Sequence, residues 1–239
     1  MAGKGSRFSD WNLPKPYINV FEKPLFYWAY ISLANQVKFE NIFCIVLDDH
    51  NLKFKASTII SNYIKESKVL SLPKVENGPA RTIWKLMQHI PENQLIIISD
   101  CDQAFLEKSF VSKITKEFED IKVEAVISSI KSENEQHGFI QTNEKDEVTQ
   151  CEEKNFISDR AFGGVYAFRN KEALETSLNL SLLNTTTDKE IFLSYVISEI
   201  IESGKIVKNI FIEEHVSMGT PDEFLANKSS PLFGKLTKC

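Results

Sequence analysis

Apolar runs in this chain alternate with segments that have a helical spacing of apolar residues. The runs at 41–47 and 94–99 are apolar almost throughout, which is typical of strands buried on both faces. Further strands are predicted at 68–72, 123–128, 138–142, 147–151, 163–168 and 206–212. Helices are predicted at 24–37, 54–66, 80–89, 106–120 and 187–203.

The order of these elements predicts an α/β fold. Strands separated by helices imply right-handed crossovers, so we expect a Rossmann-like, mostly parallel central sheet flanked by helices. After Gly138 the strands are joined by polar turns, which favours a small antiparallel subsheet. Because no internal repeat or low-complexity linker occurs, we predict a single domain over residues 1–226 and a peripheral C-terminal tail over 227–239.

Composition narrows the class of protein. The 239 residues suffice for one α/β domain with a full core. A net charge of −5 argues against a nucleic-acid-binding surface. The four cysteines form no C-x-x-C pair, and no apolar run is long enough to span a membrane. We therefore expect a cytoplasmic protein with reduced thiols that binds neither nucleic acid nor a membrane.

The opening loop is the first candidate site. Gly3 and Gly5 flank Lys4, Arg7 follows, and Lys15 lies between two prolines. Glycines allow backbone N–H groups to approach phosphate oxygens, and the basic side chains add positive charge. The pattern indicates a triphosphate site, although a loose, glycine-rich terminus would look the same.

A second candidate site is acidic. Asp100, Cys101 and Asp102 follow the buried run at 94–99, and ligands in open α/β sheets bind beyond the carboxyl ends of strands. A carboxylate there can hold Mg²⁺, whose other ligands are waters and phosphates. The alternative is that the aspartates cap a helix.

Three segments together resemble the signature of the nucleotidyltransferase superfamily: 2–8, 14–17 and 23–25. That superfamily includes sugar-phosphate nucleotidylyltransferases and cytidylyltransferases, and the resemblance implies a GT-A-like fold. The family loop follows a buried first strand, which we expect to be absent because Met1 directly precedes the loop. The nucleotide-binding residues that the resemblance implies in this region are Ala2, Gly3, Lys4, Gly5, Ser6, Arg7 and Lys15.

The resemblance extends to later segments. It implies Asp102 as the metal ligand, with Asp100 and Cys101 beside the nucleotide. The segment 77–82 resembles the base-recognition element, which implies that Asn77, Gly78, Ala80 and Thr82 contact the base. A simple loop before a helix is the alternative interpretation.

Two further elements resemble the acceptor side of the family site. Glu153 and Lys154 are implied to reach the acceptor phosphate, although a charged pair is also typical of a solvated edge. Gly163 and Gly164 are implied to lie under the acceptor, and a strand bulge would explain them equally well.

The segment 217–221 resembles the family's D-[IV]-G-T-P motif with Ser217 in place of the aspartate. In many members that aspartate is the second metal ligand. Its replacement implies that Asp102 acts with waters and phosphates alone, or with Glu213, Glu214 or His215.

The resemblance implies transfer of a nucleotidyl group to a phosphorylated acceptor with release of pyrophosphate, with Mg²⁺ as cofactor and Arg7, Lys15 and Lys154 as catalytic residues. CTP is the first choice of nucleotide, followed by UTP or dTTP. The acceptor alternatives are phosphoglutamine, phosphocholine and a sugar 1-phosphate, as in cytidylyltransferases of capsule assembly. Two other functions stay open: a GT-A glycosyltransferase that uses Asp100 and Asp102, and a non-catalytic nucleotide-binding regulator.

Overall fold

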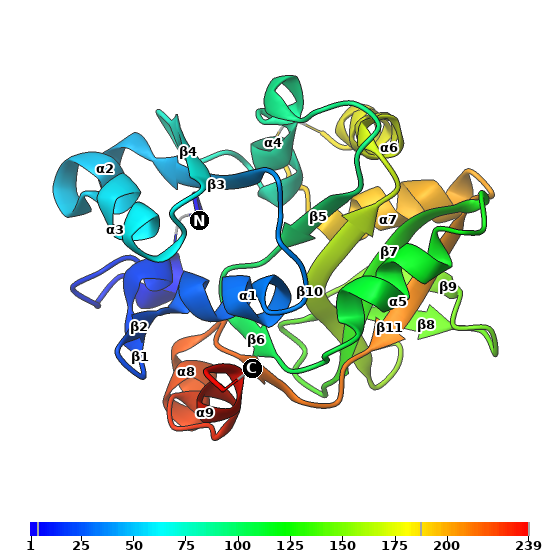
Figure 1. The fold of residues 1–239 in the computed structure, drawn as a ribbon. Coiled ribbons are helices and arrows are strands. Elements are labelled where there is room, and N and C mark those ends of the chain that lie inside the picture. Colours follow the sequence, from blue (N-terminus) through cyan, green and yellow to red (C-terminus); the bar gives the residue numbers. More distant parts are fainter. Residues whose placement is uncertain (4, 187, 239) are drawn as a thin grey trace. The chain divides into compact units, whose positions relative to one another are not determined.

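The computed structural model describes residues 1–3, 5–186 and 188–238. The chain forms two compact units whose segments interleave along the sequence (Figure 1). Unit 1 contains Met1–Glu76, Asp100–Lys108 and Glu214–Cys239, and unit 2 contains Asn77–Ser99 and Ser109–Glu213. The single domain over residues 1–226 stays a prediction.

Unit 1 combines short strands with helices. It contains the parallel pair β3–β4 and the antiparallel pair β6–β12. The two strands of the second pair lie far apart in the sequence. In chain order the elements are η1 (Ser6–Phe8), η2 (Lys15–Tyr17), β1 (Asn19–Val20), β2 (Lys23–Pro24), α1 (Leu25–Ala34), β3 (Ile42–Leu47), α2 (Asp48–Phe54), α3 (Ala56–Tyr63), β4 (Ser67–Leu72), β6 (Gln103–Phe105), β12 (His215–Ser217), α8 (Pro221–Asn227) and α9 (Leu232–Leu236).

The core of unit 1 includes the indole of Trp28 on α1. Its Nε1 donates a hydrogen bond to the Val20 carbonyl at 2.9 Å, and its ring lies 4.8 Å from that of Phe233 between centroids. Leu232, Phe233 and Leu236 on α9 are buried in the same cluster. Part of the segment predicted as a peripheral tail therefore contributes to the core.

Unit 2 is built on one sheet with the strand order β11-β7-β10-β8-β9, and β5 also pairs with β10. In chain order its elements are α4 (Pro79–Trp84), η3 (Met87–His89), β5 (Ile96–Ser99), α5 (Phe110–Glu117), β7 (Val123–Lys131), β8 (Gly138–Thr142), β9 (Val148–Glu153), β10 (Arg160–Phe168), α6 (Lys171–Asn184), α7 (Leu193–Glu202) and β11 (Ile206–Phe211).

The α/β fold is confirmed, and the sheet of unit 2 is mixed. β11 runs parallel to β7, whereas β10 runs antiparallel to β5, β7 and β8. β8 lies between β9 and β10 and runs antiparallel to both. The expected antiparallel subsheet is present as β8 and β9.

Helices cover both faces of this sheet. Ala125 and Ile127 on β7 lie in one cluster with Leu174 and Leu178 of α6 and Ile197 of α7. Because side chains alternate along a strand, the neighbouring Val126 is buried on the other face, where α5 packs against β7 and β11 (Figure 1).

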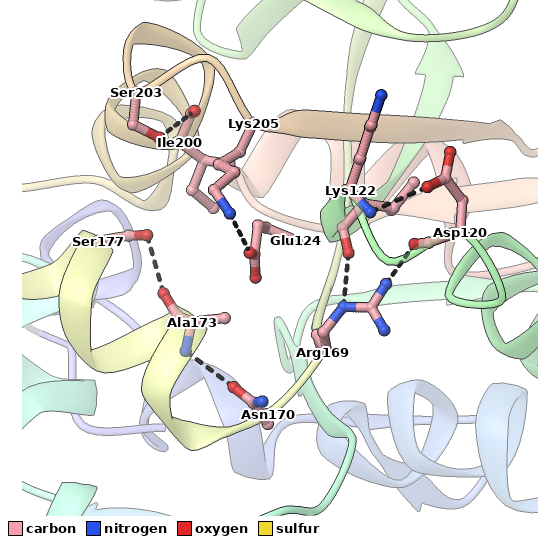
Figure 2. Close-up of polar contacts among 11 residues, drawn as sticks. Asp120, Lys122, Glu124, Arg169, Asn170, Ala173, Ser177, Ile200, Ser203 and Lys205 are labelled. Atoms are coloured by element: carbon pink, nitrogen blue, oxygen red, sulfur yellow. Dashed lines mark hydrogen bonds and ion pairs between the residues drawn. The ribbon is translucent and has the colours of Figure 1, made fainter.

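Arg169 ties the end of β10 to the loop before β7 (Figure 2). Its Nε donates to the Val123 carbonyl at 2.9 Å, its Nη1 donates to the Phe118 carbonyl at 3.0 Å, and its Nη2 donates to the Asp120 carbonyl. The next residue, Asn170, caps α6 by accepting the Ala173 N–H at 2.9 Å. These contacts fix the start of α6 against the sheet.

Candidate active site

The glycine loop at the start of unit 1 presents accessible backbone. A Cβ atom added to Gly3 or Gly5 would meet no other atom within 4 Å, and Gly5 has a φ of +58° that favours glycine. Ala2 is buried, as is Phe8, which anchors the loop through an edge contact to Trp11 at 5.3 Å between ring centroids. Ser6 and Arg7 are exposed on η1. Lys4 lies outside the described residues.

Lys15 and Asp102 form an ion pair in unit 1. Lys15 Nζ donates a hydrogen bond to Asp102 Oδ2, and the two side chains are 21% and 18% exposed. Burial opposes both charged forms, but the attraction between the two groups outweighs it: the pKa of Asp102 is lowered and that of Lys15 is raised. The pair therefore stays ionised.

Two strands place Asp102 next to the 217–220 loop. Gln103 on β6 pairs with Ser217 on β12, and Met218 N donates to the Asp102 carbonyl at 2.9 Å. Asp100 adds a further negative charge near Lys15. Burial raises the pKa of the Cys101 thiol, so this side chain stays neutral.

Glu223, on the first turn of α8, organises the 217–220 loop. Its Oε2 accepts hydrogen bonds from Ser217 Oγ at 3.1 Å, Gly219 N at 3.0 Å and Thr220 N at 3.1 Å. Thr220 Oγ1 in turn accepts the Glu223 N–H, which completes a capping box. Sequence reasoning missed Glu223, although the T-x-x-E pattern of Thr220 and Glu223 was a usable signal.

Two of the residues considered as a second metal ligand, Glu214 and His215, have contacts of their own. Glu214 forms an ion pair with Lys235, and His215 lies on β12 opposite Phe105. Among the described residues, no group of three or more His, Cys, Asp or Glu side chains gathers in a way that could hold a metal ion.

The residues predicted for base recognition build a turn in unit 2. Asn77 Nδ2 donates to the Asp188 carbonyl at 2.8 Å, and the Asn77 carbonyl accepts the Ile191 N–H at 3.2 Å. Gly78 has a φ of +104°, and a Cβ atom there would lie 2.4 Å from the Ile191 backbone. Ala80 is buried, and Thr82 Oγ1 donates to the Gly78 carbonyl at 3.2 Å. Base contact by these residues stays a prediction.

Glu153 and Lys154, at the end of β9, have partners at the start of α7. Ser194 Oγ donates to Glu153 Oε2 at 2.8 Å, and Lys154 Nζ lies 4.7 Å from the centroid of the Phe192 ring. Burial raises the pKa of Glu153 despite this hydrogen bond and the nearby Lys154 charge. Phe192 and Ser194 were missed because nothing in the sequence links them to β9.

Gly163 and Gly164 mark a bulge in β10. The β10–β7 register shifts between Phe162 and Tyr166, and Gly164 has a φ of +77°. A Cβ atom on Gly163 would lie 2.6 Å from Ser128 Oγ, which accepts the Val165 N–H at 3.0 Å. Packing within the sheet is sufficient to explain both glycines, and their contact with an acceptor stays a prediction.

Within the described part of the chain, we find no helix with the length and apolar character needed to cross a membrane.

The chain matches the model of one protein family and resembles several solved structures. The chain resembles the nucleoside-diphosphate-sugar pyrophosphorylase from Vibrio cholerae RC9, with a TM-score of 0.77, 21% identity and coverage of 95% of this chain and 96% of the other. It also resembles the inositol-1-phosphate CTP transferase from T. maritima, with a TM-score of 0.79, 17% identity and coverage of 99% and 94%. No curated sequence matches significantly.

At these identities the solved structures support the fold, and the family model supports the class of enzyme. The model of the MobA-like NTP transferase domain matches residues 1–164, which include the glycine loop, Lys15 and Asp102. The chain therefore belongs to the MobA-like NTP transferase domain family and is a nucleotidyltransferase.

Proposed function

We propose that this protein transfers a cytidylyl group from CTP to a small phosphorylated acceptor and releases pyrophosphate. The observation that carries the proposal is the ion pair between Lys15 and Asp102 beside an open glycine loop. It combines, within unit 1, a cation for the triphosphate, a carboxylate and accessible backbone N–H groups. An inositol-1-phosphate CTP transferase among the structural neighbours supports CTP and a phosphorylated acceptor.

The acceptor phosphate is already an anionic nucleophile, so the reaction requires no general base. One of its oxygens forms a bond to the α-phosphorus of CTP as the bond from that phosphorus to the bridging oxygen breaks. Pyrophosphate leaves with the electron pair. The task of the protein is to hold the reacting groups in line and to neutralise developing charge.

The residues of unit 1 bind the triphosphate in this proposal. The backbone of Gly3 and Gly5 contacts phosphate oxygens, and Arg7 adds charge at the exposed face of the loop. Lys15 leaves Asp102 for the triphosphate and then stabilises the departing pyrophosphate. Contacts of Lys154 with the acceptor phosphate and of Asn77 to Thr82 with the base, both in unit 2, stay predictions.

Asp102 fits a divalent cation. Its carboxylate already holds a positive group, the Lys15 ammonium, and carboxylate oxygen is a preferred ligand of Mg²⁺. Next to it, Gly219 has no side chain to fill the space beside Asp102 Oδ2. In the proposed site, Asp102 would hold Mg²⁺, which when bound supplies a template and a Lewis acid for the phosphates.

We propose a product that serves capsule or other surface-polysaccharide synthesis, with phosphoglutamine, phosphocholine or a sugar 1-phosphate as acceptor. The test is pyrophosphate release from CTP, UTP, dTTP and ATP in the presence of each acceptor and Mg²⁺. We expect release only with the correct pair, with CTP preferred. A glycosyltransferase would release no pyrophosphate from any of them, and that result would refute the proposal.

A further inference from the structure

Arg81, on helix α4 of unit 2, carries buried donors that the rest of the chain does not satisfy. Its Nε and Nη2 atoms are shielded from solvent, and neither has a hydrogen-bond partner within the part of the chain that the structure describes. Burying a charged donor without a partner is costly, and native proteins seldom do so. The orphaned donors therefore indicate a ligand.

The two orphaned nitrogens lie on the same edge of the planar guanidinium, the edge remote from Cδ. Their N–H bonds point in the same direction, which is the geometry that pairs with two oxygens of one phosphate or carboxylate group. A water molecule would present a single neutral oxygen to this edge. An oxyanion presents two oxygens and also neutralises the charge.

A short segment of unit 2, residues 191–194, connects the turn of Arg81 with Lys154 at the end of β9. The Ile191 carbonyl accepts the N–H of Ala80, the residue before Arg81, at 3.1 Å. The Phe192 ring lies 4.7 Å, at its centroid, from Lys154 Nζ. The elements that carry the two cations are therefore held by neighbouring residues of one segment.

Lys154 is a second cation of unit 2 without an acidic partner. Among the described residues its side chain contacts the Phe192 ring and forms no ion pair. Its backbone has a φ of +57°, in the left-handed region that a lysine adopts only at a cost in free energy. Arg81 and Lys154 thus give unit 2 two positive charges that are free to bind an anion.

We propose that Arg81 binds a phosphate group of a substrate through Nε and Nη2. This inference rests on the proposed function, which supplies phosphate compounds as substrates. The phosphorylated acceptor and CTP share this chemistry, and the location of Arg81 in the same unit as Lys154 favours the acceptor. The two-point contact fixes the orientation of the phosphate, whereas a lysine contributes only charge. Because both nitrogens are shielded, the side chain changes rotamer as the phosphate enters.

The first experiment follows the arginine Nε–H resonances of the full-length, ¹⁵N-labelled protein. The Arg81 signal is assigned by its absence from the spectrum of Arg81→Lys. Inorganic phosphate, phosphocholine, glucose 1-phosphate and CTP are added separately. We expect the Arg81 signal to shift with inorganic phosphate and with a phosphorylated acceptor. A shift with CTP alone would support phosphate binding and assign the contact to the nucleotide.

The second experiment measures affinity for the same compounds by calorimetry. Arg81→Lys keeps the charge but loses the two-donor edge, and Arg81→Met loses both, so each should bind at least about tenfold more weakly. Lys85→Met is the matched control, because it removes an exposed cation one turn further along the chain and should bind as the wild type does. Since the Arg81 donors are unsatisfied, Arg81→Met should melt at the same temperature as the wild type or higher.

Wild-type affinity in Arg81→Met would overturn the proposal. An Arg81 signal that none of the phosphate compounds moves would also overturn it, since ordered water would then be enough for the donors. This spectrum decides the question even if Arg81→Met fails to fold. Pyrophosphate release by the wild type is measured separately. Its absence together with a shifted Arg81 signal refutes the proposed function alone, whereas normal release with unchanged affinity in Arg81→Met refutes only the role of Arg81.

Discussion

The Lys15 ammonium donates a hydrogen bond to the carboxylate of Asp102, a residue 87 positions away in the sequence. The pair joins the two segments that the sequence pattern indicates as a triphosphate site and a metal site. Each group shifts the pKa of the other toward the charged form, against the effect of burial. The pair is therefore both a structural contact in unit 1 and the centre of the proposed chemistry.

Lys15→Ala should reduce turnover by roughly 10²-fold or more, because it removes the positive charge that we propose stabilises the leaving pyrophosphate. Pyrophosphate release under saturating nucleotide checks this. The control is Lys53→Ala, which removes an exposed lysine paired with Asp49 on α2 and should leave the rate unchanged. Near-normal turnover in Lys15→Ala would contradict the role given to Lys15.

Asp102→Asn should lower the free energy of unfolding by about 1–3 kcal/mol, since it leaves the largely buried Lys15 charge without its acceptor. Adding Lys15→Met to this variant removes the orphaned charge and should recover part of the loss. Urea unfolding of the two single variants and the double variant gives the coupling energy. Strictly additive effects would mean that the two residues do not interact.

Glu153→Gln should stabilise unit 2 at neutral pH. Burial raises the pKa of Glu153 above its ordinary 4.5, so the folded state binds this proton more tightly than the unfolded state does. The wild type therefore loses stability as the pH rises from below 4.5 through the folded-state pKa, whereas the glutamine variant does not. Denaturant unfolding at pH 4 and pH 7 should show the advantage of the variant only at pH 7. Glu152→Gln serves as the control for loss of one negative charge.

Gly163→Ala should destabilise the protein by about 1–3 kcal/mol, because its Cβ would lie 2.6 Å from Ser128 Oγ in a packed sheet. Gly234→Ala, on α9, is the matched control. Its Cβ would meet nothing within 4 Å, so alanine should stabilise the helix by about 0.5–1 kcal/mol. Equal effects of the two substitutions in thermal unfolding would contradict the packing explanation.

The long apolar strands were predictable because burial on both faces leaves a continuous apolar run. The predicted strand 41–47 corresponds to β3, and 94–99 corresponds to β5. β6 and β12 were missed, since a three-residue strand is too short to show any period. Their pairing is nevertheless what brings Ser217 to Asp102, so this part of the site required the structure.

Helix α6 was missed for a different reason. Its buried face combines Leu174 and Leu178 with the serines Ser177 and Ser181, so the apolar stripe is interrupted. The helix predicted from residue 187 begins at Leu193 instead. Backbone hydrogen bonds between Ile191 and the segment 77–80 hold the chain before it in a non-helical conformation. Such long-range contacts leave no local signal.

The sequence suggests those parts of the candidate site whose chemistry follows from residue type alone, such as a glycine, a lysine or an aspartate. Gly3, Gly5, Lys15 and Asp102 are predicted from the sequence as site residues, and the structure brings Lys15 and Asp102 together. Glu223 was not identified, because its relation to Asp102 depends on where α8 folds back. The position of a carboxylate close to Asp102 is not visible in a sequence until the fold is known.

Unit 1 draws on three separated stretches of the chain, and the last of them begins at Glu214. During synthesis on the ribosome, Lys15 and Asp102 emerge long before β12 and α8 do. A nascent chain arrested before residue 214 would lack the strand that pairs with β6 and the carboxylate of Glu223. The surroundings of Asp102 should therefore be completed only near the end of translation.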